Sequence, residues 1–138
     1  MNRTFTLSVL PELFAVCRLQ PGASIPAWAA IDAPAMLLSI TRTHDELSIV
    51  CPEKSVPAAI TAEGDPKAER GWSGLRVAGV LDFSLTGVIA QLTETLAAVG
   101  ITVFTLATYD TDYILIRHES LERAARALRL EGHTVEGL

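Results

Sequence analysis

Two short polar segments have the residue types needed to bind a small charged molecule. The first is the stretch 82–88, where polar residues and a glycine separate two apolar patterns, and the second is the stretch 108–112. Small polar residues ahead of a helical apolar pattern are typical of a helix N-terminus, whose unpaired backbone amides can bind a carboxylate. In the second stretch, Asp112 could receive an ammonium group, and Tyr109 could offer a ring face or a hydroxyl. Together the two segments could hold both charged groups of an amino acid.

Each feature also has a purely structural interpretation. Asp82, Ser84 and Thr86 could merely cap the helix, and the sequence alone favours this because every helix needs a cap. Asp112 could bond its own backbone in a turn, and Tyr109 could belong to the core.

The elements that position these segments follow from the hydrophobic pattern of residues 75–138. An apolar run at 75–81 predicts a strand, and apolar residues at helical spacing from 88 to 99 predict a helix that ends at Gly100. The runs at 101–108 and 113–116 predict a strand hairpin, and a second helix and a short closing strand at 133–135 follow. This βαββαβ order is the ferredoxin-like arrangement.

The same region resembles the ACT domain, the small ligand-sensing module of aspartate kinases and other amino-acid-regulated enzymes. The motifs that carry the resemblance are Asp82-Phe83-Ser84-Leu85-Thr86-Gly87-Val88 and Thr108-Tyr109-Asp110-Thr111-Asp112-Tyr113-Ile114-Leu115. Within that superfamily the chain is similar to stand-alone bacterial ACT proteins related to the eukaryotic cytosolic arginine sensors. The resemblance implies a ligand site formed by Asp82, Phe83, Ser84, Leu85, Thr86, Gly87, Val88, Thr108, Tyr109 and Asp112.

One position departs from the arginine sensors. Those proteins have an acidic residue for the guanidinium in the first loop, whereas this chain has Leu85 there. A leucine cannot neutralise a cation, and burying an unpaired charge is costly. We therefore expect a smaller or less charged amino acid than arginine.

The first half of the chain has a shorter version of the pattern. We expect a strand at 4–10, a turn at Pro11-Glu12, a second strand at 13–19, and a hairpin of strands 35–41 and 47–51. A short helical turn at 26–30 precedes the hairpin. The Pro, Gly and charged residues between 54 and 74 indicate a linker, at whose end Trp72 should pack back on the body.

A weak internal repeat relates the two halves. Residues 36–53 match the pattern of residues 102–119 at an offset of 66, which predicts equivalent hairpins at 36–51 and 102–117. We expect an α+β protein with two ferredoxin-like ACT halves side by side, the first one incomplete. The expected segments are an incomplete half at 1–62, a linker at 63–74 and an ACT domain at 75–138.

Composition restricts the function. The net charge of −5 gives no basic stripe for nucleic acid, and no apolar stretch reaches the length of a membrane span. Cys17 and Cys51 lie in apolar strand patterns, which favours buried reduced thiols of a cytoplasmic protein over the alternative of a disulfide. The scattered Cys and His residues suggest no metal site, and neither a cofactor motif nor a nucleophile–base pair is present.

These observations predict a non-catalytic sensor that binds an amino acid or similar small molecule at an ACT–ACT interface. The alternative is a structural module with a vestigial cleft that acts through dimerisation. We expect a homodimer, because small sheets leave strand edges unprotected.

Overall fold

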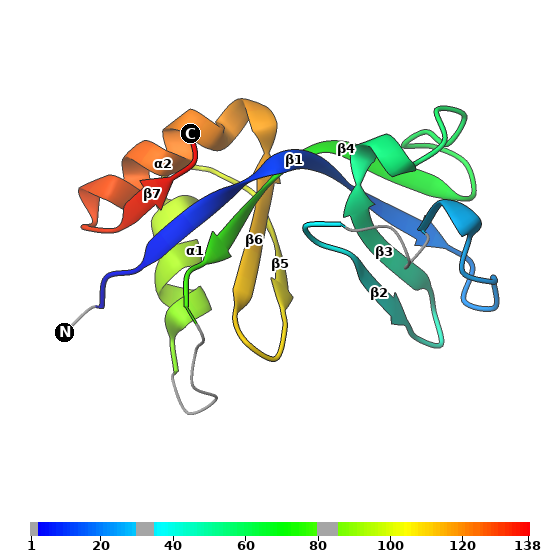
Figure 1. The fold of residues 1–138 in the computed structure, drawn as a ribbon, viewed down its shortest axis with the longest axis horizontal. Helices are drawn as coiled ribbons and strands as arrows, with labels where there is room; N and C mark the ends of the chain where they lie inside the picture. The colour runs from blue at the N-terminus through cyan, green and yellow to red at the C-terminus, as the bar shows by residue number, and fades with distance from the viewer. Residues whose placement is uncertain (1–2, 30–34, 80–85) are drawn as a thin grey trace. The chain divides into compact units, whose positions relative to one another are not determined.

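The computed structural model describes residues 3–29, 35–79 and 86–138. Seven strands and two α-helices follow one another in these residues (Figure 1). The elements are β1 (Thr6–Leu19), β2 (Ser39–Arg42), β3 (Leu47–Pro52), β4 (Lys67–Val77), α1 (Val88–Ala98), β5 (Val103–Ala107), β6 (Asp112–Arg117), α2 (Leu121–Leu130) and β7 (Thr134–Glu136). Single 3₁₀ turns occupy Ala27–Ala29, Glu53–Ser55 and His118–Ser120.

The chain divides into two compact units, and two strands contribute to both. The C-terminal unit contains residues 1–11 and 73–138, and the N-terminal unit contains residues 12–72. The division differs from the expected segments at 1–62, 63–74 and 75–138, because its boundaries fall inside β1 and β4.

The C-terminal unit has the predicted βαββαβ order in β4, α1, β5, β6, α2 and β7, which confirms the ferredoxin-like fold. Its strand order is β7-β1-β4-β6-β5, so the N-terminal part of β1 lies between β7 and β4. The Phe5 carbonyl accepts the amide of Thr134 at 2.9 Å, and the Thr6 carbonyl accepts the amide of Ala78 at 2.8 Å. The first residues of the chain thus belong to this unit.

The two helices of this unit pack against each other, and their buried sides share one apolar core with the strands (Figure 1). Leu92 and Leu96 on α1 and Leu128 on α2 are fully buried in it, together with Ile114 and Ile116 on β6. These are the apolar positions of the two periodic patterns in the sequence, and their burial stabilises the helices.

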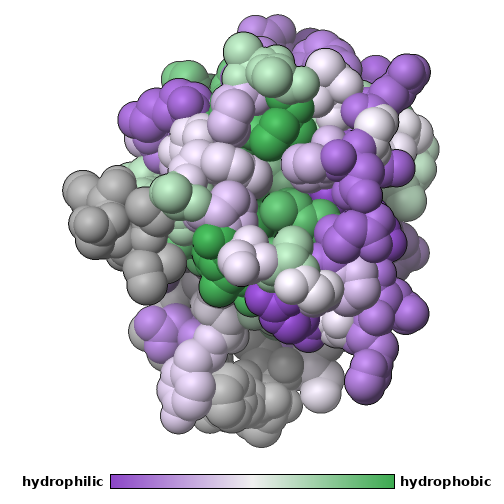
Figure 2. Space-filling model, turned by 90° about the vertical axis from the view of Figure 1, so that its right-hand side faces the viewer, coloured by the Kyte–Doolittle hydropathy of each residue, from purple (hydrophilic) through white to green (hydrophobic). Residues whose placement is uncertain are grey.

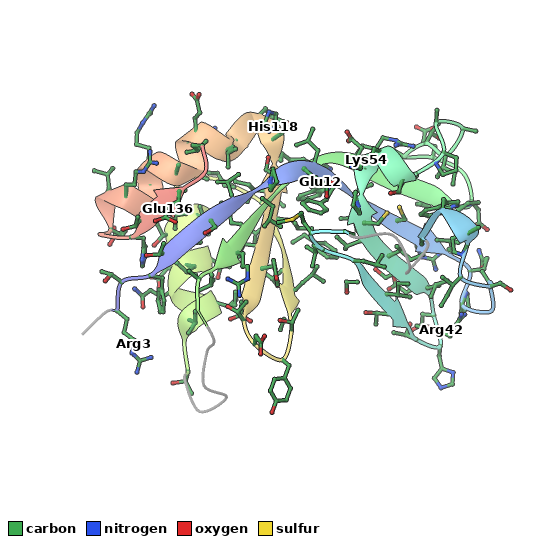
Figure 3. All side chains as sticks on the ribbon, viewed as in Figure 1. Arg3, Glu12, Arg42, Lys54, His118 and Glu136 are labelled. Carbon is green, nitrogen blue, oxygen red and sulfur yellow. The ribbon has the colours of Figure 1, made fainter. Side chains whose placement is uncertain are left out.

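The N-terminal unit has strands β2, β3, the second part of β1, and the first part of β4, in that order. The predicted hairpin of β2 and β3 is present, with Ser39 opposite Val50 and Arg42 opposite Leu47. No α-helix occurs among the described residues of this unit, as expected for an incomplete half. Glu12 and Lys54 form an ion pair of 2.7 Å there (Figure 3).

The predicted turn at Pro11-Glu12 is wrong, because β1 continues through it. Thr6–Ser8 pair with β7 and Phe14–Leu19 pair with β3, and Pro11 lies between these two stretches. Its missing N–H therefore removes no hydrogen bond from either pairing.

The expected linker at 63–74 also differs from the structure, because β4 begins at Lys67. Exposed Lys67 and Glu69 alternate with buried Ala68 and half-buried Arg70, and Trp72 is buried, as expected. The outward positions of this strand hold charged residues and a glycine, which are typical of a linker, so the sequence pattern does not predict the strand.

The β2–β3 hairpin and the β5–β6 hairpin are equivalent when each residue of the first is matched with the residue 65 positions later, rather than 66. Thr43 donates its amide to the Glu46 carbonyl at 2.8 Å, and Thr108 donates its amide to the Thr111 carbonyl at 2.9 Å, so Thr43 corresponds to Thr108. Each hairpin turn therefore begins with a threonine and has an aspartate two residues later. The expected match of 36–51 with 102–117 is off by one residue.

Large apolar side chains are exposed only in small groups on the face drawn in Figure 2, where polar residues separate the apolar ones. Of the described residues in the N-terminal unit, Leu13, Ile25 and Met36 are the exposed large apolar ones. Isolated residues of this kind are normal on a protein surface.

Candidate functional site

The turn between β5 and β6 contains three of the residues that the sequence assigns to a ligand. The Thr108 hydroxyl donates to the Thr111 carbonyl at 3.0 Å and accepts the Thr111 amide at 3.3 Å. Thr108 therefore closes the turn, in the manner of threonines that bond to nearby backbone. It fixes the conformation from which Tyr109 and Asp112 project.

Tyr109 and Asp112 differ in their surroundings. Tyr109 is 79% exposed, so the interpretation as a core residue is wrong. Asp112 is half-buried at the start of β6, opposite Ala107. Its carboxylate makes no hydrogen bond or ion pair with another described residue, and it is thus available for a cationic group.

Thr111 is a functional candidate that sequence reasoning missed. Its side chain is buried, with 3% exposed, and its hydroxyl donates to the Val77 carbonyl at 2.7 Å. Val77 is the last residue of β4. This buried hydrogen bond holds the turn at the end of the strand from which the chain continues toward α1.

The N-terminus of α1 has a glycine where a capping side chain was expected. Gly87 occupies the N-cap with φ +79° and offers no side-chain hydrogen bond, and its carbonyl accepts the Gln91 amide at 2.9 Å. Thr86 is exposed, and Val88 begins the helix and is buried. Asp82, Phe83, Ser84 and Leu85 lie outside the described residues. The amides of this first helical turn retain the capacity to bind an anion.

A cavity of about 550 Å³, which we call the α1 cavity, lies along this helix in the C-terminal unit. Thr86 and Gly87 line it, whereas Thr108, Tyr109 and Asp112 do not. Its other charged or buried polar lining residues are Arg3, Glu94, Glu131 and His133. The structure thus brings only part of the predicted site into this cavity.

His133 is the second residue that the sequence analysis missed. It is 4% exposed, its Nδ1 accepts the Phe5 amide at 3.0 Å, and its ring stacks on Phe5 with centroids 5.7 Å apart. Burial lowers the pKa of His133 from its ordinary value, an effect that Glu131 partly opposes. Its partner is 128 residues away in the sequence, so no local pattern could reveal it.

Comparisons with known proteins agree with this geometry. The model of the ACT domain family matches residues 67–129, and the model of an N-terminal domain family matches residues 12–59. The crystal structure of a protein from Agobacterium tumefaciens has a TM-score of 0.85 and 33% identity, covering 98% of this chain and 94% of that one. The chain belongs to the ACT domain family.

Two more distant structures share the fold of this ACT protein. A protein from Vibrio cholerae described as a possible transport protein has a TM-score of 0.68 at 16% identity, with 92% of this chain and 89% of that one covered. The ligand-free regulatory subunit of aspartate kinase from Thermus thermophilus has a TM-score of 0.58 at 14% identity, with 90% and 95% covered. No curated protein matches the sequence. The family supports a regulatory role based on binding a small molecule.

Cys17 and Cys51 are buried free thiols, and a hydrogen bond between them lowers the pKa of Cys17 and raises that of Cys51. In the described ranges, no three His, Cys, Asp or Glu side chains are grouped to hold a metal ion. None of the helices described is long and apolar enough to cross a membrane.

Proposed function

We propose that this ACT protein is a non-catalytic regulatory sensor that binds an amino acid or a similar small molecule between the N-terminus of α1 and the turn at 108–112. The observation that carries the proposal is the buried hydrogen bond from Thr111 to the Val77 carbonyl. It holds the β5–β6 turn at the end of β4, and the chain leads from there to the helix N-terminus.

The two sides of this site offer complementary charges. Backbone amides near Val88, at the positive end of the α1 dipole, bind the ligand carboxylate. Asp112, whose carboxylate has no partner among the described residues, binds the α-ammonium, and Thr108 contributes a remaining lone pair of its hydroxyl. Tyr109 covers the ligand from the exposed side of the turn.

In this proposal Leu85 determines which amino-acid side chains the site accepts. A leucine at this position disfavours a guanidinium, so the preferred amino acid is smaller or less charged than arginine. Three further features stay predictions: the location of the site at an ACT–ACT interface, the cytoplasmic location of the protein, and its assembly as a homodimer. Light scattering tests the homodimer directly.

The role of Asp112 is tested by calorimetry with Asp112→Asn. The amino acid used is the one that raises the melting temperature of the wild-type protein most in a screen of all twenty. Loss of a charge-assisted bond worth about 1.5–3 kcal/mol weakens binding by roughly ten- to a hundred-fold.

Asp110→Asn is the matched control, since Asp110 is an exposed aspartate of the same turn. It should leave the affinity within about twofold of wild type. Equal affinities for Asp112→Asn and wild type would remove the ammonium-binding role from Asp112.

A further inference from the structure

Cys17 and Cys51 are neighbours on two paired strands of the N-terminal unit. In the antiparallel pairing of β1 with β3 (Figure 1), Cys17 is opposite Ile49 and Cys51 is opposite Ala15. Side chains alternate between the two faces of a sheet, so Cys51, two residues after Ile49, lies on the same face as Cys17. Both cysteines belong to one buried apolar cluster, with 2% and 1% of their surface exposed.

The two thiols contact each other. The Cys51 S–H donates a hydrogen bond to the Cys17 sulfur, which lowers the pKa of Cys17 and raises the pKa of Cys51. The positive charge of Arg70 favours the thiolate form of both cysteines. Its guanidinium is held in place because it donates to the Pro57 carbonyl at 2.8 Å and to the Ile60 carbonyl at 2.9 Å. A thiol favoured as thiolate beside a neutral second thiol is the pairing found in redox-sensing cysteines.

The spacing of the two cysteines suits a disulfide that forms and breaks. Residues at diagonal positions of an antiparallel pair have Cα atoms roughly 7–8 Å apart, whereas most disulfides join Cα atoms about 4.4–6.8 Å apart. A bond between Cys17 and Cys51 therefore requires β1 and β3 to move toward each other by about 1 Å. Strained disulfides of this kind are more easily reduced than relaxed structural ones.

We propose that Cys17 and Cys51 are a site of reversible oxidation by peroxides, at which a disulfide forms between β1 and β3. The Cys17 thiolate attacks one oxygen of hydrogen peroxide, the O–O bond breaks, and the departing hydroxide takes up a proton to become water. The Cys51 sulfur then forms a bond to the sulfur of the Cys17 sulfenic acid, whose hydroxyl leaves as water with the Cys51 proton. The two thiols lose two electrons in total, and the peroxide gains them.

Burial of both thiols determines which oxidant can reach them. Hydrogen peroxide is a small molecule that can enter during small local openings of the strands, whereas a tripeptide disulfide such as oxidised glutathione needs a larger and rarer opening. Cys17 and Cys51 take no part in the proposed amino-acid site, so this proposal and the proposed function can each fail without the other.

The experiment treats the whole folded protein with hydrogen peroxide and measures its intact mass, followed by peptide mapping without reductant. The mass should fall by two hydrogen atoms, and the map should join the peptides that contain Cys17 and Cys51. Dithiothreitol should restore both thiols. Oxidised glutathione at the same concentration should form the bond roughly tenfold more slowly or not at all.

Two variants test the separate roles of the cysteines. Cys51→Ser keeps a donor for the Cys17 sulfur and removes the second thiol, so the Cys17 sulfenic acid should accumulate and react with dimedone. Cys17→Ser leaves Cys51, whose burial disfavours the thiolate, so dimedone labelling should be lower by roughly tenfold. Thermal unfolding establishes that both variants are folded, and the wild-type experiment depends on neither of them.

Three results with the folded wild-type protein would overturn the proposal. The first is that peroxide leaves both thiols reduced, and the second is that a cysteine gains oxygen without a link between Cys17 and Cys51. The third is a link between two protein molecules in place of one within a single chain. Equal dimedone labelling of the two variants would overturn the role of Cys17 as the attacking thiol.

Discussion

Thr111 and His133 show that single long-range hydrogen bonds organise the ACT domain around its candidate sites. Thr111 contacts the end of β4, 34 residues earlier, and His133 contacts Phe5 at the start of the chain. Neither residue belongs to an apolar pattern, and neither partner is near in sequence. The sequence places Thr108 and Asp112 on the right hairpin, but it cannot show which threonine closes the turn and which one holds it to β4.

Replacing Thr111 with valine tests that hydrogen bond. Valine has almost the same shape, but the buried Val77 carbonyl loses its donor, so the free energy of unfolding should fall by about 1–3 kcal/mol. Chemical denaturation measures the change. Thr102→Val, at an exposed position, is the control and should change stability by less than about 0.5 kcal/mol. Equal stability of the two variants would contradict the structural role of Thr111.

His133 should make stability depend on pH. Its pKa in the folded protein lies below the ordinary 6.5, because burial disfavours the imidazolium. Below pH 6.5 the unfolded chain binds a proton that the folded protein does not bind, so the free energy of unfolding falls as the pH decreases from 6.5 toward the folded pKa.

Urea denaturation at several pH values, compared between wild type and His133→Asn, isolates this contribution from that of the carboxylates. The variant should lose less stability than wild type over this range. An identical pH dependence in the two proteins would show that His133 titrates with an ordinary pKa.

Element by element, the hydrophobic pattern predicts type and order well and boundaries less well. In the C-terminal unit the periodic leucines of α1 and the β-branched runs of β5 and β6 determine the βαββαβ order, because their burial is what stabilises those elements. The hydrophobic pattern gives the wrong prediction at Pro11 and over β4. A proline and charged residues occupy strand positions there, and these residue types are equally typical of a turn or a linker. The offset of the hairpins differs by one residue because the apolar runs are long enough to match at either offset.

Gly87 is the residue on which the start of α1 depends. Its φ of +79° is a conformation that a side chain disfavours, although a Cβ there would meet no atom within 4 Å. Gly87→Ala should therefore destabilise the protein by about 1–2 kcal/mol through backbone strain alone. Thermal unfolding measures this effect.

Gly22→Ala is the matched control, since Gly22 has equally open surroundings and no positive φ. It should be neutral or slightly stabilising. If both variants are equally stable, the left-handed N-cap does not determine where α1 begins.

On the scale of the whole molecule, membership of the ACT domain family supports a regulatory role based on binding a small molecule, and the structure shows how the strands of the two units are connected. The chain alternates between two units, since β1 and β4 each contribute to both, and the strand at the N-terminus lies between β7 and β4. The sequence pattern predicts two domains that follow one another along the chain, because local patterns carry no information about the pairing of strands that are distant in sequence. The motifs of the proposed ligand site, ahead of α1 and on the β5–β6 hairpin, are in contrast local and can be recognised in the sequence.

The central claim, that the protein binds an amino acid at the N-terminus of α1 and the β5–β6 turn, is tested most directly by backbone ¹H–¹⁵N spectra recorded with each of the twenty amino acids. We predict that at least one, smaller or less charged than arginine, saturably shifts the amides of both Val88 and Asp112, with a dissociation constant of about 1 mM or tighter. If no amino acid shifts both amides at concentrations of about 10 mM, or if arginine is preferred, the account of this site is contradicted.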